Sequence, residues 1–195
     1  MLKPKQLVAI SMIVSAMMAS ERFAYSAECQ GARFPDSVAV GTTNLVLNGL
    51  GIRKATMLKV KVYVAGLYLP EKSGDADKIL GTPQPWHLVL HFLRDVDASD
   101  IREAYDDGFK KAAGDKLASL QQRIDGMNAR IVDLKEGQEL SFTNNPATGI
   151  EMDVNGKGGD VIEGADFATA FLKISIGPEP PNEDLKSGLL GGKCE

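Results

Sequence analysis

The sequence predicts an α+β domain in which an antiparallel sheet is covered on one face by helices. Two observations support this class. Segments with the alternating pattern of strands occur as pairs along the chain, and segments with helical spacing are inserted between and after those pairs. The chain has 195 residues and no Pro-, Gly- or Ser-rich linker, so we expect a single domain.

The composition is that of an ordinary globular protein, with 44% hydrophobic and 25% charged residues. The net charge is −4, and no run of Lys and Arg exceeds two residues. A nucleic-acid site needs a concentrated basic surface. We therefore expect no nucleic-acid partner.

The N-terminus has the anatomy of a secretory signal peptide. Two lysines precede an apolar run over residues 7–19, which is shorter than the roughly 20 residues of a spanning helix. Small residues occupy positions −3 and −1 of a cut after Ser26. We expect residues 1–26 to be removed and residues 27–195 to form a periplasmic or secreted domain without a membrane span.

Two cysteines, Cys29 and Cys194, lie near the two ends of the expected mature chain. An oxidising compartment permits a disulfide between them, and the ends of compact domains commonly lie close together. Two unrelated terminal thiols are the alternative.

The first half of the domain is predicted to be mainly strand. A strand over 38–46 is expected to end in a turn over 45–51. The strongest strand signal covers 52–69, where valines alternate with Lys and Tyr with a period of two. A short helical turn over 75–80 and a strand over 86–93 follow.

The second half is predicted to begin with a helix capped by Asp97-Ala98-Ser99. Apolar residues recur at helical spacing from there to Ala112, with acids in the first turn and lysines in the last. The remaining predicted elements are a helix over 115–127, a strand over 140–142, a hairpin of strands 149–154 and 161–162 around Asn155-Gly156, a helix over 165–176 ended by Gly177-Pro178, and a helical turn over 184–190.

Several chemistries have no motif in this chain. There is no Gly-x-Ser-x-Gly elbow, no Walker motif, and neither cysteine has a base nearby in sequence. Residues 156–159 are interpreted as a hairpin tip, and Asp95-x-Asp97-x-Ser99 as helix capping, because a calcium loop needs a glycine and a closing Glu.

The two histidines lie four residues apart on a predicted strand. His87 and His91 therefore share one face but stand roughly 13 Å apart, too far to hold one ion together. We expect no metal site and no cofactor. A single axial histidine for haem, from either residue, stays open as an alternative.

Polar side chains line one side of the predicted strand over 52–69. Arg53, Lys59, Lys61 and Tyr63 are all odd-numbered and would face one way if the strand is regular. Cationic and phenolic groups above an apolar floor suit an amphiphilic anion, which Arg binds through its two-pronged guanidinium. A solvated sheet face with long side chains lying over it is the alternative.

Three segments, Asn48–Leu69, Leu90–Val96 and Val161–Gly177, resemble the chalcone isomerase superfamily, most closely its secreted bacterial chalcone isomerase-like branch. The resemblance extends over roughly residues 38–190. It implies an open-faced β-sandwich, in which a large antiparallel sheet lies under a layer of helices.

The same superfamily contains isomerases that cyclise chalcones without a cofactor and relatives that bind fatty acids without chemistry. By resemblance, the arginine of the enzymes falls near Arg53. Their other polar site residues fall on Tyr63 and near or on Ile101, Gly108 and Ile174, so only the arginine persists. Without those hydroxyl and amide groups, little remains to direct proton movement.

We therefore expect non-catalytic binding of a fatty acid or similar amphiphilic anion, with Arg53, Lys61 and Tyr63 as ligand-binding residues. The alternative is an isomerase or intramolecular lyase for a chalcone-like or other enone substrate. Arg53, Tyr63 and Tyr105 are then the candidate catalytic residues, with either tyrosine as the acid. Haem binding is the second alternative.

Overall fold

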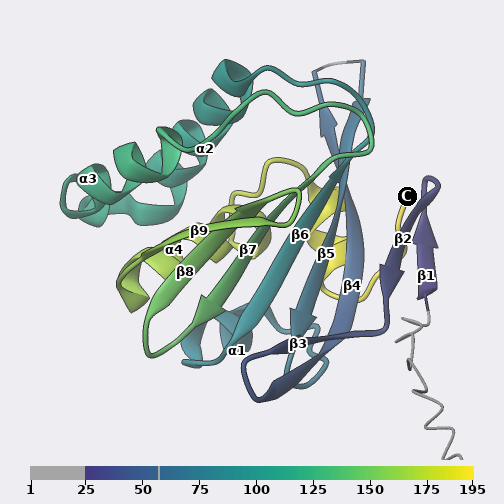
Figure 1. The fold of residues 1–195 in the computed structure, drawn as a ribbon, viewed down its shortest axis with the longest axis horizontal. Coiled ribbons are helices and arrows are strands. Elements are labelled where there is room, and N and C mark those ends of the chain that lie inside the picture. Colours follow the sequence, from purple (N-terminus) through teal and green to yellow (C-terminus); the bar gives the residue numbers. More distant parts are fainter. Residues whose placement is uncertain (1–24, 57) are drawn as a thin grey trace, which may run out of the picture.

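The computed structural model describes residues 25–56 and 58–195 and is built on one antiparallel sheet of seven strands (Figure 1). Each strand of this sheet pairs with the next one in the chain, in the order β3-β4-β5-β6-β7-β8-β9. These strands are β3 (Ser37–Val40), β4 (Thr43–Ala55), β5 (Val60–Leu69), β6 (Trp86–Phe92), β7 (Glu139–Asn145), β8 (Gly149–Val154) and β9 (Lys157–Ile162). The α+β class and the antiparallel sheet predicted from the sequence are confirmed.

The helices are inserted between strands or follow the sheet. They are α1 (Ala76–Gly81), α2 (Ala98–Ala113), the 3₁₀ turn η1 (Gly114–Lys116), α3 (Leu117–Asn128), α4 (Ala165–Ile176) and α5 (Glu183–Leu189). The predicted bounds of α4 are those observed. In the described part of the chain, no helix is long and apolar enough to cross a membrane.

The predicted turn over 45–51 is wrong, because these residues are the middle of β4. The glycines that suggested a turn serve close packing instead. A side chain at Gly51 would place its Cβ 2.2 Å from the carbonyl oxygen of Leu185, and one at Gly49 would come as close to that of Gly188. Helix α5 therefore lies directly on the backbone of β4. The register shifts at Asn48, whose side-chain amide donates to the Leu189 carbonyl at 2.7 Å.

The strand predicted over 52–69 is also interrupted. The chain reverses between β4 and β5, with Thr56 and Lys59 in the left-handed region at φ 62° and 52°. The Lys59 amide donates to the Thr56 carbonyl at 3.1 Å. The residues of the turn carry neither Gly nor Pro, so the alternating pattern ran through it without a break.

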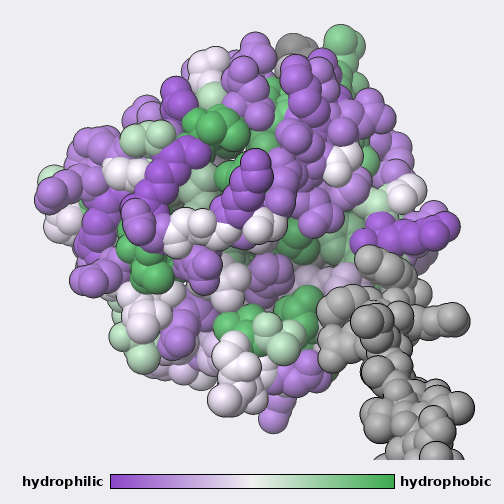
Figure 2. Space-filling view, viewed as in Figure 1, coloured by the Kyte–Doolittle hydropathy of each residue, from purple (hydrophilic) through white to green (hydrophobic). Residues whose placement is uncertain are grey.

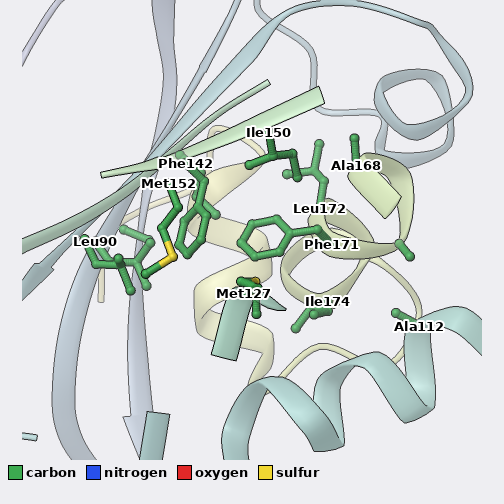
Figure 3. Packing of buried hydrophobic residues seen from close by; sticks show 14 of the residues in the cluster. Leu90, Ala112, Met127, Phe142, Ile150, Met152, Ala168, Phe171, Leu172 and Ile174 are labelled. Carbon is green, nitrogen blue, oxygen red and sulfur yellow. The ribbon is translucent and has the colours of Figure 1, made fainter. Parts of the chain in front are cut away.

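One face of the sheet packs against the helices and forms the larger apolar cluster, which we call the helix-side core. Figure 3 shows the ring of Phe142, from the sheet, beside the ring of Phe171, from α4. The rings of Phe142 and Phe171 have their centroids 4.3 Å apart.

The other face is covered by a two-stranded hairpin, β1 (Tyr25–Cys29) and β2 (Ala32–Pro35), which the sequence analysis did not predict. Phe34 packs there among apolar residues of β4, β5 and β6, and we call this cluster the hairpin-side core. Cys29 is joined to Cys194 by a disulfide, so the expected pairing is present. Residues 1–24 of the predicted signal peptide lie outside the described residues.

Helix α2 begins at Ala98, but neither Asp97 nor Ser99 supplies the predicted cap. The Ala98 amide instead donates to the carboxylate of Asp133 at 2.9 Å, from the segment that enters β7. This partner is 35 residues away in sequence, and a local capping pattern does not reveal it.

The disulfide closes a loop with a sequence separation of 165 residues. Converting both Cys29 and Cys194 to Ser is expected to lower the free energy of unfolding by about 4–5 kcal/mol, because the unfolded chain regains its freedom. Urea unfolding of the oxidised protein and the double variant measures this. Reductant should destabilise the wild type and leave the variant unchanged. Equal stability of the two proteins would contradict this role.

Gly188 tests the close contact between α5 and β4. A Cβ there would lie 2.2 Å from the Leu50 carbonyl oxygen, so Gly188→Ala should cost about 1–3 kcal/mol or more. Gly126 of α3 is the matched control, since a Cβ there meets nothing within 4 Å. Gly126→Ala should stabilise the protein by about 0.5–1 kcal/mol. Thermal unfolding in which both variants shift the same way would refute this packing.

Candidate functional site

A cavity of about 550 Å³ lies between the sheet and helix α2. Its floor is apolar side chains of β5 and β6, including Ala65, Leu88 and Leu90, and its roof includes Ile101 of α2. Its mouth lies where the β4–β5 turn, the β6–α2 segment and the α4–α5 connection meet. A second hollow of about 830 Å³, between the β7–β8 turn and the start of α4, has no cation among its described lining residues.

A β-bulge in β5 sets which side chains face the cavity. Arg53 pairs with Tyr63 across the strands, but the next residue, Lys54, pairs with Lys61, so Val62 is an extra residue. Val62 and Tyr63 therefore both line the cavity, together with Arg53.

Lys61 does not share this face. It is exposed, and its ammonium group donates to the side-chain oxygen of Gln30 at 2.6 Å, beside the β1–β2 hairpin. The expectation that Arg53, Lys59, Lys61 and Tyr63 all face one way is therefore wrong, because it assumed a regular strand. Lys59 belongs to the β4–β5 turn and is exposed as well.

Arg53 is half-buried and lines the cavity near its mouth. Its Nη1 donates to the backbone carbonyl of Lys54 and, at 3.4 Å, to that of Pro181. Among the described residues, no carboxylate lies within ion-pair distance of this guanidinium. No carboxylate of the described residues therefore neutralises its charge.

The α4–α5 connection is fixed to β4 beside this arginine. The side chain of Asn182 accepts from the Lys54 amide at 3.1 Å and donates to the Ile52 carbonyl at 3.0 Å. Lys54 also forms an ion pair with Asp184, with 2.7 Å between nitrogen and oxygen. These contacts hold the wall of the mouth against the sheet.

Two phenols, Tyr63 and Tyr105, line the same cavity. The Tyr63 ring packs on Phe92, and the Tyr105 ring on Phe171 at a centroid distance of 5.5 Å. Within the described part of the chain, neither hydroxyl has a hydrogen-bond partner. Both tyrosines were predicted from the sequence as candidate site residues, and the fold brings them together with Arg53.

Burial raises the pKa of both phenols further above neutral pH. It raises the pKa of Tyr63 to about 12, and the positive charge of Arg53 opposes this rise. Burial also raises the pKa of Tyr105 well above its usual 10, with a smaller contribution from Tyr63 nearby. At neutral pH the two groups are therefore hydrogen-bond donors and not bases.

The positions suggested by the family resemblance also meet at this cavity. Ile101 and Gly108 of α2 and Ile174 of α4 all line it, but none carries a polar side chain. A Cβ at Gly108 would lie 2.6 Å from Ile174, so the missing side chain lets α4 approach α2. The cavity therefore combines Arg53 with two tyrosines, while these three positions are apolar.

The histidines lie on the opposite face of β6 from the cavity. His87 shares a hydrogen bond of 2.9 Å with the Thr143 hydroxyl, and burial lowers its pKa to about 4. His91 lies 3.2 Å from the Glu139 carboxylate. Neither lines the cavity, and the described residues contain no cluster of metal-ligating side chains.

Charged groups around the mouth, which the sequence analysis did not assign to the site, are of both signs. Asp95 is paired with Lys135 at 3.0 Å, and Asp107 with Lys110 at 2.9 Å. The other charged residues at the mouth are Arg94, Asp97, Asp100, Lys111 and Glu179. They are brought together from three segments by the fold, so no local pattern marks them.

The raised pKa of Tyr63 predicts a loss of stability in alkali. An unfolded tyrosine ionises near pH 10, whereas the native Tyr63 holds its proton to about pH 12. The free energy of unfolding should therefore fall as the pH rises from about 10 to about 12. Tyr63→Phe should reduce this fall, measured by urea unfolding across that range. Identical pH profiles for the two proteins would show that the phenol is not sheltered.

The comparisons with known proteins agree with this architecture. The chalcone isomerase-like family matches residues 26–191, which is most of the chain. A crystal structure of a fatty-acid binding protein from Arabidopsis thaliana is similar, with a TM-score of 0.68 and 15% sequence identity, over 82% of this chain and 92% of that one. No curated protein matches. At this identity the plant structure shows the fold alone, and the family match shows that the chain belongs to the chalcone isomerase-like family.

Proposed function

We propose that this protein binds a fatty acid or a similar amphiphilic anion without converting it. The observation that carries this proposal is Arg53, a cation without a carboxylate partner among the described residues, placed on the wall of an apolar cavity. A long apolar molecule with one carboxylate matches both the positive charge of Arg53 and the apolar lining of the cavity. The similar plant structure is itself described as a fatty-acid binding protein, which supports the same class of ligand.

The bound carboxylate is placed between Arg53 and Tyr63. These residues are directly opposite each other on β4 and β5, so one carboxylate can accept from the guanidinium and from the phenol. Charge-assisted hydrogen bonds of this kind are about twice as strong as neutral ones. The apolar body then lies on Leu88 and Leu90 beneath Ile101, where burial out of water favours it.

Non-catalytic binding fits the protonation of the site. Both phenols hold their protons well above neutral pH, so neither serves as a general base. Ile101, Gly108 and Ile174 offer no hydroxyl or amide to orient a reacting group. The one feature that favours the alternative, an isomerase for an enone in which Tyr63 or Tyr105 donates a proton, is that both phenols line the cavity with Arg53. Their raised pKa values make them weaker acids and count against it.

We also propose that residues 1–26 direct the chain to the periplasm or out of the cell. The lysines, the apolar run and the small residues before Ala27 support this. The Cys29–Cys194 disulfide supports an oxidising compartment. The domain that acts is then residues 27–195.

Arg53→Ala tests the anchor. The variant should keep its fold and bind a fluorescent fatty-acid analogue about 10–100-fold more weakly, because a hydrogen-bonded charge contributes about 1.5–3 kcal/mol. Lys61→Ala is the matched control. Because Lys61 lies on the other face, this variant should bind the analogue as the wild type does. Equal binding by Arg53→Ala and wild type would exclude Arg53 as the anchor.

A spectrophotometric screen of chalcones and related enones separates binding from catalysis. We expect no turnover by the wild-type protein. Turnover that disappears in Tyr63→Phe or Tyr105→Phe would instead establish the isomerase and contradict the non-catalytic proposal.

A further inference from the structure

The end of the molecule that carries the cavity mouth also carries an exposed apolar side chain. Leu58, in the β4–β5 turn, is 87% exposed, the most of any large hydrophobic residue in the described part of the chain. Val132 and Val161 follow at 51% and 41%. Two exposed cations follow Leu58, Lys59 directly and Lys61 after Val60. We call Thr56, Leu58 and Lys59, which belong to the turn between β4 and β5, the hairpin tip; it is distinct from the β1–β2 hairpin and from the turn at residues 156–159.

The chemistry of the hairpin tip is unusual for a turn in water. Thr56 and Lys59 both have positive φ, a region that Gly and Asn adopt far more readily. The turn is nevertheless ordered by hydrogen bonds, from the Leu58 amide to the Thr56 hydroxyl at 3.3 Å and from the Lys59 amide to the Thr56 carbonyl. It holds Leu58 outward where a turn normally carries small polar residues.

The hairpin tip borders the cavity mouth. Ala55 and Thr56 on one side of Leu58, and Val60 on the other, all line the cavity. Figure 2 shows a mostly hydrophilic surface with hydrophobic atoms projecting at the top of the view, the end where Figure 1 places the β4–β5 turn. Whatever contacts Leu58 therefore lies against the opening.

The charge directly beside Leu58 is positive, from Lys59 and Lys61, whereas the charged residues elsewhere at the mouth are mostly acidic, with Asp95, Asp97, Asp100, Asp107 and Glu179 against Arg53, Arg94 and Lys111. Lys54 is neutralised by Asp184. The pKa of the Asp184 carboxyl is lowered mainly by its hydrogen bond with Lys54, and the charge of Lys59 nearby adds a smaller contribution. Lys61 contacts only the neutral side chain of Gln30 among the described residues. An apolar side chain flanked by lysines matches the interface of an anionic bilayer, where acyl chains lie beneath negative headgroups.

We propose that the hairpin tip docks on the surface of an anionic phospholipid bilayer, with Leu58 inserted below the headgroups. The side of the cavity mouth next to the hairpin tip then lies against the bilayer, with the acidic residues of the mouth turned toward water, and an amphiphile passes between cavity and bilayer along the tip. This inference rests on the proposed function. One leucine and two lysines make a weak and reversible contact, which suits a carrier that must leave the membrane with its load.

Vesicle co-sedimentation of the mature chain tests the docking. The protein should pellet with vesicles of phosphatidylglycerol and phosphatidylcholine, less with phosphatidylcholine alone, and less as salt is raised. Leu58→Ser should weaken binding about tenfold, and Lys59→Gln about fivefold. Val132→Ser is the control for an exposed apolar residue, and Lys72→Gln, beyond the opposite end of β5, is the control for charge. Both should bind as the wild type does.

Absence of pelleting by the wild type, or equal effects of Leu58→Ser and Val132→Ser, would overturn the docking proposal. Binding of the fatty-acid analogue in solution, measured on the same variants, separates a failure of the docking proposal from a failure of the proposed function. Leu58→Ser should bind the analogue normally. A wild type that binds the analogue but no vesicles refutes the docking alone. One that pellets through Leu58 but binds no analogue supports the docking surface and refutes the proposed function.

Discussion

The central strands of this sheet are apolar on both faces, and each face must be covered separately. Ala65 and Leu67 of β5 face the helices, whereas Val64 and Tyr68 of the same strand belong to the hairpin-side core. Burial of this area is the main driving force for the fold. The helices cover one face, and a short hairpin, held to the C-terminal end by the disulfide, covers the other.

The two covers differ in completeness, and the candidate site follows from that difference. Phe34 fills the hairpin side so closely that a Cβ at Gly66 would lie 2.9 Å from its ring. On the helix side, α4 and α5 pack tightly, but α2 leaves a cavity above β5 and β6. One extra residue in β5 then directs Tyr63 into this space beside Arg53, and Lys61 away from it. The site is therefore defined by where the fold places the Arg53 guanidinium, on the wall of this cavity.

Local patterns in the sequence were enough to predict the sheet and most of the helices. Of the three residues expected to bind ligand, Arg53 and Tyr63 line the cavity and Lys61 does not. Helix α4 follows from its own apolar stripe and the glycine that ends it. Arg53 and Tyr63 were predicted from alternation and resemblance. The reversal at Thr56–Lys59 was missed because its residues are poor signals for a turn, and the bulge that displaces Lys61 has no local signature.

Other features depend on residues far apart in the sequence. The cap of α2 comes from Asp133, the glycines of β4 are explained only by α5, and the charges around the mouth come from separate segments. These are consequences of tertiary packing, which periodicity within one segment does not contain.

The decisive experiment is a crystal structure of the protein with a bound saturated fatty acid. We expect both carboxylate oxygens within about 3.2 Å of the Arg53 guanidinium or the Tyr63 hydroxyl, with the acyl chain running over Leu88 and Leu90 beneath α2. A carboxylate held elsewhere, such as in the hollow between the β7–β8 turn and α4, or a cavity closed by the helices, would contradict it.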